Sequence, residues 1–272
     1  MSQKLPIPPS QPLPDGERLC HTYAQLPAVY DELWTAEQTI RKPWEAYIAA
    51  IQARSCTEVI QQRQEVARQL RENGAAYNIH GDPRGHAHAW QLDIVPLILG
   101  RDAWQQIEAG LAQRARLMNL LLRDLYGHGK LVSEGLLPAA LIFAHQGFLR
   151  PCRNLVATTA PQLMLYAADL ARDAGGRFRV LADHTQMPRG LGHALENRTA
   201  LANTTSPLLR TCKVQRLSSF FRRLRDALAA RAPRRSAQPR TVIYATDPRR
   251  RDYFEQAYLG GYLNYPVVQG ED

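Results

Sequence analysis

The expected fold is decided by the stretch Asp183-His184-Thr185-Gln186-Met187-Pro188-Arg189-Gly190-Leu191-Gly192-His193-Ala194-Leu195-Glu196-Asn197-Arg198. The five residues before it are apolar enough to predict a short β-strand that ends on an acid. Pro188 presets φ, and Gly190 and Gly192 allow positive φ or a close backbone approach, so the middle predicts a turn. We therefore expect a hairpin that brings Asp183 and Glu196 close together.

Asp183, Glu196 and Asn197 are candidate metal ligands. Two carboxylates and a carboxamide make an all-oxygen cluster, which suits magnesium bridging nucleotide phosphates. Arg198 beside them would neutralise charge on a transferred phosphoryl group. Neighbours in an ideal strand point to opposite faces, which favours Glu196 over Asn197 as a ligand. The alternative is a structural hairpin whose acids face water and pair with nearby arginines.

The run D-x-T-Q-x-P-x-G-x-G-x-A-L-E-N-R resembles the signature of the circularly permuted ATP-grasp proteins of type 2. Other segments, from roughly residue 44 to the end of the sequence, are similar to the same family. They are Trp90-x-Leu92-Asp93-x-x-Pro96-Leu97, Gln113-Arg114-Ala115, Leu122-x-Asp124-Leu125-Tyr126-Gly127, Ala168-Asp169-Leu170-Ala171-Arg172, Tyr253-Phe254-Glu255 and Tyr258-Leu259.

The resemblance implies an ATP-dependent carboxylate–amine ligase that acts through an acylphosphate, with magnesium and ATP as cofactors and small-molecule or peptide substrates. By motif, Asp183, Glu196 and Asn197 would hold the metal and Arg198 would steady the phosphoryl group. Gly190 and Gly192 become candidate nucleotide-binding residues.

Arg114 is a second candidate catalytic arginine. It lies on the apolar stripe of a helix expected over 101–126, between Leu111 and Met118. It either pairs with a buried acid such as Asp93, extends to the surface, or presents its guanidinium to a phosphate or carboxylate. The sequence leaves these three alternatives open.

The fold class expected is α+β, an ATP-grasp-like half followed by the start of a Rossmann-like βαβ unit. Residues 1–18 read as a flexible tail, 19–231 as the metal- and nucleotide-binding half, 232–238 as a linker and 239–272 as the incomplete Rossmann-like unit. The family continues further, so we expect a truncated chain or one completed by a second polypeptide. The alternative function is a non-catalytic half that binds a partner through its basic helix.

The remaining secondary structure follows from periodicity and turn residues. The sequence predicts helices over 57–72, 161–174, 213–230 and 251–259, strands over 75–80, 88–99, 241–245 and 265–268, a linking segment over 201–211, and turns at 81–85, Gly175-Gly176 and Gly260-Gly261.

Composition narrows the possible functions. The net charge is +9, but much of the excess lies in 216–240 and 249–251, so a nucleic-acid-binding module ranks third. No apolar run is long enough for a membrane span, and no secretory signal is expected. The four cysteines show no C-x-x-C spacing, which fits a reducing cytoplasm.

Overall fold

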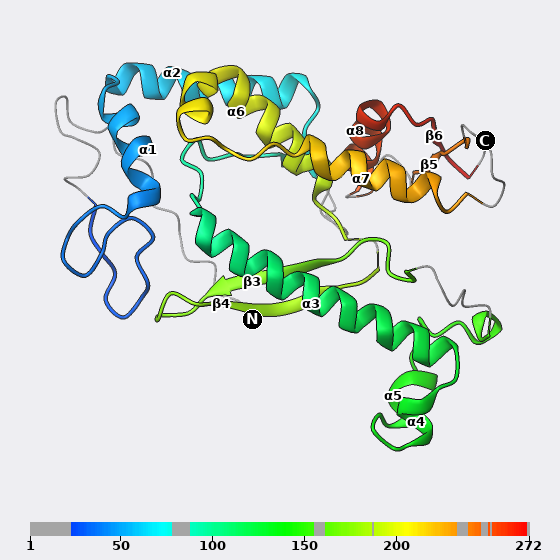
Figure 1. The fold of residues 1–272 in the computed structure, drawn as a ribbon. Coiled ribbons are helices and arrows are strands. Elements are labelled where there is room, and N and C mark those ends of the chain that lie inside the picture. Colours follow the sequence, from blue (N-terminus) through cyan, green and yellow to red (C-terminus); the bar gives the residue numbers. More distant parts are fainter. Residues whose placement is uncertain are drawn as a thin grey trace. The chain divides into compact units, whose positions relative to one another are not determined.

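The computed structural model describes residues 23–77, 88–154, 161–186, 188–232, 239–245, 250 and 252–270. These residues form a mixed α+β structure in which helices predominate, which confirms the expected class (Figure 1). The predicted tail, the turn at 81–85 and residues 233–238 of the linker lie outside the described residues. Among the helices of the described ranges, none has the length and apolarity needed to cross a membrane.

The chain divides into two compact units, each built from separate segments of sequence. Unit 1 comprises Met1–Ile98, Leu191–Phe221 and Val242–Asp272, and unit 2 comprises Leu99–Gly190 and Arg222–Thr241. The division at 232–238 that the sequence predicts stays a prediction.

Unit 1 opens with α1 (Lys42–Gln52) and α2 (Cys56–Glu72). Helix α2 starts at a capping box, in which the Ser55 side chain accepts from the Glu58 amide while the Glu58 carboxylate accepts from the Ser55 amide. It ends at Asn73, and Gly74 takes a positive φ of 68°. This confirms the helix predicted over 57–72. Strands β1 (Ala76–Tyr77) and β2 (His88–Ala89) then pair antiparallel, as predicted, although they are shorter than expected.

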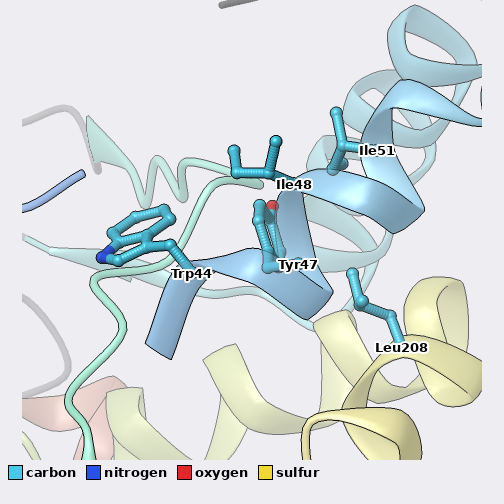
Figure 2. Close-up of a cluster of buried hydrophobic side chains, with 5 residues drawn as sticks. All are labelled: Trp44, Tyr47, Ile48, Ile51 and Leu208. Atoms are coloured by element: carbon cyan, nitrogen blue, oxygen red, sulfur yellow. The ribbon is translucent and has the colours of Figure 1, made fainter. Parts of the chain in front are cut away.

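The core of unit 1 packs α1 and α2 against α6 (Leu191–Thr211). Figure 2 shows one cluster, formed by four residues of α1 and Leu208 of α6. Its α1 members recur at helical spacing: Trp44, Tyr47, Ile48 and Ile51. A second cluster joins α2, the segment after β2 and α6 through Val66, Leu70, Ala75, Ile94 and Ala200. These contacts hold α6 along much of its length.

Helix α6 corrects the central prediction. The segment expected to return as the second strand of a hairpin, and the segment 201–211 expected to be a link, together form α6, which consists of two helical pieces that meet at a kink at Thr205. Gly192, Leu195, Glu196 and Ala200 are buried at three- and four-residue steps, the spacing of a helix packed on a core, which explains the outcome. The helix bends near Thr205 and Pro207, because proline removes a backbone donor inside it.

The end of unit 1 forms the β–α–β arrangement that the sequence predicts. Strands β5 (Ile243–Tyr244) and β6 (Val267–Val268) pair in parallel, and α8 (Tyr253–Leu263) connects them. The turn predicted at Gly260-Gly261 is wrong, since α8 continues through both glycines and ends before Asn264, which has a φ of 57°. A Cβ on Gly260 would lie 2.4 Å from Cγ2 of Val267, so this glycine permits close packing against β6.

Unit 2 contains the long helix α3 (Arg101–Tyr126), which has the predicted bounds. Two short helices, α4 (Lys130–Ser133) and α5 (Ala139–Phe143), and a 3-10 turn (Arg150–Cys152) follow it. Helix α7 (Ser218–Ala229) begins in unit 1 and continues in unit 2, within the predicted 213–230.

The helix predicted over 161–174 is wrong. Residues Ala167–Arg172 form strand β3, which pairs antiparallel with β4 (Phe178–His184) around Gly175-Gly176 (Figure 1). The Ala, Leu and Arg content of β3 favours a helix locally, but pairing with β4 outweighs that propensity. The strand predicted before Asp183 is confirmed, whereas its partner precedes it in the chain instead of following it.

Candidate functional site

Asp183 lies near the end of β4 in unit 2, where Arg114 of α3 holds it with two hydrogen bonds. Arg114 Nε donates to Oδ1 at 2.9 Å, and Nη2 donates to Oδ2. The Tyr166 hydroxyl also donates to Oδ1. The Asp183 side chain is only 20% exposed, so both carboxylate oxygens are engaged in a partly desolvated place. Arg114 therefore pairs with an acid, as one alternative expected, but the acid is Asp183 and not Asp93.

A β-bulge sets the direction in which Asp183 points. The register changes between Asp169 and Leu170 of β3, so that Ala168 pairs with Asp183 while Leu170 pairs with Val180. Paired residues share a face of an antiparallel ladder, and residues two apart in β3 also share one. Asp183 therefore lies on the same face as Val180, although strict alternation would place it on the opposite one.

The charges around Asp183 stabilise its ionised form. Hydrogen bonds from Arg114, and then from Tyr166, lower the pKa of Asp183 to about 2. The same carboxylate raises the pKa of Arg114 above its already high value. Burial, followed by the hydrogen bond to Asp183, raises the pKa of Tyr166, so the phenol remains a proton donor at neutral pH. The group is an ion pair that is complete within unit 2.

The polar residues of the motif that follow Asp183 in the sequence lie in unit 1, on one face of α6. His193 lies three residues before Glu196 and four before Asn197, so its side chain neighbours each of theirs on the helix surface. Glu196 and Asn197 are adjacent in the sequence and project about 100° apart around the helix, instead of to opposite faces as in a strand. Helix α6 packs against α2 on one side and α8 on the other.

Glu196 is fully buried, with 0% exposure. Its Oε1 accepts a hydrogen bond of 2.7 Å from Nδ2 of Asn73, which follows the end of α2. Within the described part of the chain, Oε2 is buried and has no hydrogen-bond partner. Burial raises the pKa of Tyr258 on α8, hydrogen bonding with Thr199 lowers it, and hydrogen bonding with the Glu196 carboxylate raises it, so the Tyr258 hydroxyl lies close to this acid. Unit 1 thus holds a buried acid with one carboxylate oxygen unsatisfied.

Asn197 is held by a residue from the segment after β2. Its Oδ1 accepts a hydrogen bond of 2.8 Å from the indole Nε1 of Trp90. Both side chains are partly buried. An amide oxygen can accept two hydrogen bonds, so Oδ1 keeps one acceptor position beyond the indole. Trp90 therefore fixes the orientation of the Asn197 side-chain amide, with Oδ1 toward the indole.

The start of α6 is capped by an acid from α8. Glu255 Oε1 accepts from the amides of Leu191 at 2.8 Å and Gly192 at 3.4 Å. A carboxylate is favourable there, because the first amides of a helix have no partners within the helix. A Cβ on Gly192 would lie 2.8 Å from Glu255 Cγ and 3.0 Å from its Cα and O, so Gly192 permits this contact. Gly190 has a φ of 103°, which favours glycine.

His193 connects the capped start of α6 to an aromatic layer. Its ring lies between Trp90, with centroids 4.3 Å apart, and Phe254, at 5.1 Å. Nδ1 is 3.7 Å from Oε2 of Glu255, and Nε2 is buried with no partner among the residues that the structure describes. The imidazole is thus packed into the contact between α6 and α8.

The residues that the motif predicted to act together fall in two different units. Glu196 and Asn197 lie on α6 in unit 1, while Asp183 and Arg114 are bonded to each other in unit 2. Arg198 is half-buried on α6, and burial lowers its pKa. In the described ranges, no group of three or more His, Cys, Asp and Glu side chains is arranged to hold a metal ion. The roles assigned to these residues stay predictions.

Sequence reasoning missed four residues that hold the site: Asn73, Trp90, Tyr166 and Glu255. Two of them had a usable signal, because Trp90 and Glu255 belong to segments that resemble the family. Asn73-Gly74 is typical of a helix stop, and nothing near Tyr166 in the sequence marks it as a partner of Asp183. These contacts join distant segments, so local spacing does not reveal them.

The sequence profile of the circularly permuted ATP-grasp type 2 family matches residues 96–272. The chain belongs to this family. The match covers the two carboxylates and Asn197, whereas Asn73 and Trp90 precede it.

Curated proteins similar to this ATP-grasp chain carry no described activity. An uncharacterized protein of Mycobacterium tuberculosis is 32% identical over 253 residues, which are 90% of this chain and 29% of the relative. One from Synechocystis is 29% identical over 244 residues, or 89% of this chain and 50% of the relative. One from Mycobacterium leprae is 26% identical over 243 residues, or 89% and 43%. The chain thus spans 29% to 50% of the length of these relatives.

Proposed function

We propose that the chain is part of an ATP-dependent carboxylate–amine ligase, in which α6 presents magnesium ligands to ATP. ATP-grasp enzymes transfer a phosphoryl group to a carboxylate and let an amine displace phosphate from the acylphosphate. Glu196 and Asn197 would hold the metal, and the ligand role that the motif gives Asp183 stays a prediction. Bound magnesium would neutralise charge on the nucleotide phosphates.

The observation that carries the proposal is the unsatisfied oxygen of Glu196. A buried carboxylate oxygen without a partner costs free energy, because it has lost its water. Asn73 occupies Oε1, and among the described residues no donor makes a hydrogen bond of good geometry to Oε2, although the Tyr258 hydroxyl is close to the carboxylate. A bound cation would satisfy this oxygen, and the adjacent Asn197 adds an oxygen of the type that magnesium prefers. The donor set on α6 therefore fits a hard divalent ion.

Asp183 fits the metal less directly, since Arg114 and Tyr166 engage its two oxygens. Each carboxylate oxygen can accept more than one bond, and Oδ2 accepts only the bond from Arg114 Nη2 among the contacts described above. We propose that Arg114 neutralises Asp183 until nucleotide and metal are present and then faces the phosphates. Arg198 would steady the transferred phosphoryl group.

The β5–α8–β6 segment is consistent with the start of a Rossmann-like unit that accompanies the metal-binding half. Two parallel strands do not form a stable sheet alone, so we propose that further chain or a second polypeptide completes it. Cys56, Cys152 and Cys212 are free thiols, which agrees with the cytoplasmic location that we propose. Substrates would be a carboxylate and an amine of peptide-like type.

A second candidate is a non-catalytic ATP-grasp half that binds a partner. The Arg114–Asp183 ion pair favours it, because a carboxylate already neutralised by the protein has less need of a cation. Its contact surface would be the basic side of α7, where Arg222, Arg223 and Arg225 are exposed. In this case, nucleotide and magnesium would leave the stability of the chain unchanged.

A thermal-shift titration with ATP, with and without magnesium, tests the proposal. We expect ATP with magnesium at about 100 times the dissociation constant to stabilise the chain by roughly 2.7 kcal/mol. Glu196→Gln should abolish the magnesium-dependent part, because an amide is a much poorer ligand for a divalent cation. The matched control is Glu108→Gln on the exposed side of α3, which should behave as wild type. A magnesium-dependent shift that survives in Glu196→Gln would contradict the assignment of Glu196, and no shift in wild type would favour the second candidate.

A further inference from the structure

We propose that Trp90 is a positioning residue that fixes the amide of Asn197, so that its oxygen, and not its nitrogen, faces a bound metal ion. The proposal rests on the proposed function, since it concerns the same site. It adds a residue from outside the matched segment 96–272 and gives that residue a definite task.

The indole of Trp90 and the amide of Asn197 differ in their hydrogen-bonding capacity. An indole Nε1–H can only donate, whereas a carboxamide presents an oxygen acceptor on one side and an NH2 donor on the other. At 2.8 Å from Trp90 Nε1, the atom of Asn197 must be the oxygen, because two donors would repel each other. Trp90 therefore excludes the flipped amide.

The position of Trp90 is itself determined by neighbouring contacts. Its backbone amide donates to the carbonyl of Ala75 at 3.0 Å, which ties the residue to the segment after α2. Its ring packs on the His193 imidazole, which packs in turn on Phe254. Because these contacts already hold the ring in place, the Trp90 N–H can orient Asn197 without a further loss of conformational entropy when a metal ion binds.

The orientation matters because magnesium binds oxygen and not a neutral amide nitrogen. Oδ1 accepts one bond from Trp90 and keeps a second acceptor position for a cation. Without the indole donor, the amide would sample both orientations, and the flipped one would turn the NH2 group toward the metal. Ligand-orienting hydrogen bonds typically contribute about 10- to 100-fold to metal affinity.

The test is Mn²⁺ binding to the whole chain, measured by electron paramagnetic resonance, with Trp90→Phe as the variant. Phenylalanine keeps an aromatic ring against His193 but removes the N–H donor. We expect Mn²⁺ to bind about 10- to 100-fold more weakly. Trp104→Phe is the matched control, because Trp104 lies on α3 in unit 2 and is 41% exposed.

A second background separates orientation from packing. In Asn197→Asp, both terminal atoms are oxygens, so the side chain presents a ligand in either orientation. Adding Trp90→Phe to Asn197→Asp should therefore change Mn²⁺ affinity by less than about threefold. Thermal unfolding of each variant confirms that it is folded at the temperature of the measurement.

The outcomes are distinct. A loss for Trp90→Phe in wild type but not in Asn197→Asp supports the inference. An equal loss in both backgrounds, or no loss in either, overturns it and leaves the proposed function standing. If the wild-type chain binds no Mn²⁺, both the proposed metal site and the role of Trp90 fail together.

Discussion

Glu196 in unit 1 and Asp183 in unit 2 belong to one sequence motif but lie in opposite electrostatic environments. Asp183 has a guanidinium and a phenol on its two oxygens, and its pKa falls to about 2. Glu196 is fully buried, meets a neutral amide on one oxygen and has no partner on the other among the described residues. The first acid is neutralised within the protein, and the second is not.

We infer from this difference that the two carboxylates have different roles. A carboxylate paired with arginine contributes to the stability of the fold, whereas a buried carboxylate without a counter-charge reduces it. Functional groups commonly carry such a cost, which the surrounding packing offsets. We propose that Glu196 serves to bind magnesium, and that Arg114 holds the Asp183 carboxylate in place until nucleotide and metal bind.

The largest change in the free energy of unfolding should come from forcing apart the helices that enclose Glu196. Gly192→Ala places a Cβ 2.8 Å from Glu255 Cγ and 3.0 Å from its backbone, so α6 and α8 must separate. We expect a destabilisation of about 1–3 kcal/mol, measured by urea unfolding. The control is Gly110→Ala in α3, where no atom lies within 4 Å. That change should stabilise the chain by about 0.5–1 kcal/mol, because alanine favours a helix. Equal effects of the two substitutions would contradict the close packing.

The next test compares neutral versions of the two acids without divalent cations. Glu196→Gln removes a buried charge and keeps an acceptor for Asn73, so we expect an increase of about 1–2 kcal/mol in the free energy of unfolding. Asp183→Asn breaks the ion pair with Arg114 and should lower that free energy. The loss should be the smaller of the two changes, because Arg114 is 40% exposed and water screens the pair. Effects of the same sign would remove the contrast between the acids.

The smallest expected effect is on the stability of the fold at low pH. The folded-state pKa of Asp183 is about 2, below its ordinary value of 3.8, so its pairing stabilises the fold at higher pH and is lost as the pH falls toward 2. In Arg114→Gln, the pKa of Asp183 should rise toward 3.8, and this part of the acid sensitivity should disappear. Nuclear magnetic resonance of the Asp183 carboxyl carbon would follow the titration directly.

Arg116→Gln is the control for that titration. Arg116 is exposed on α3 and its Nε donates to the Ala112 carbonyl, so its loss should leave the pKa of Asp183 low. An unchanged pKa of Asp183 in Arg114→Gln would show that the hydrogen bond from Tyr166, not the guanidinium, keeps it low.

The parts of the fold that the sequence predicted well have strong local signals. The stripe of α3 and the capping box of α2 are contained within single segments, and both helices have nearly the expected bounds. The β–α–β order at the end was also predicted correctly, because its apolar strands flank a helical segment. Local patterns of this kind do not depend on distant partners.

The failures have a common physical cause. Ala167–Arg172 has the composition of a helix, yet it pairs with β4, and the segment after Gly190 becomes a helix because its apolar residues pack on α1 and α2. For the site, the motif named Glu196 and Asn197 but assigned them to a strand. Their partners Asn73 and Trp90 are brought near only by that long-range packing. Where tertiary contacts determine the secondary structure, hydrophobic periodicity over a short window does not predict it.

The cap that Glu255 places on α6 has a consequence for the order in which the chain assembles. The hydrogen bonds around α6 join residues 123 positions apart for Asn73 and Glu196, 107 for Trp90 and Asn197, and 64 for Leu191 and Glu255. Contacts so distant in sequence close late and slow the folding of a domain. During synthesis, Asn73 and Trp90 cannot form these hydrogen bonds until α6 has been made, and α6 cannot receive its cap until α8 has been made. The buried acid therefore becomes enclosed only after the last of these segments has emerged from the ribosome.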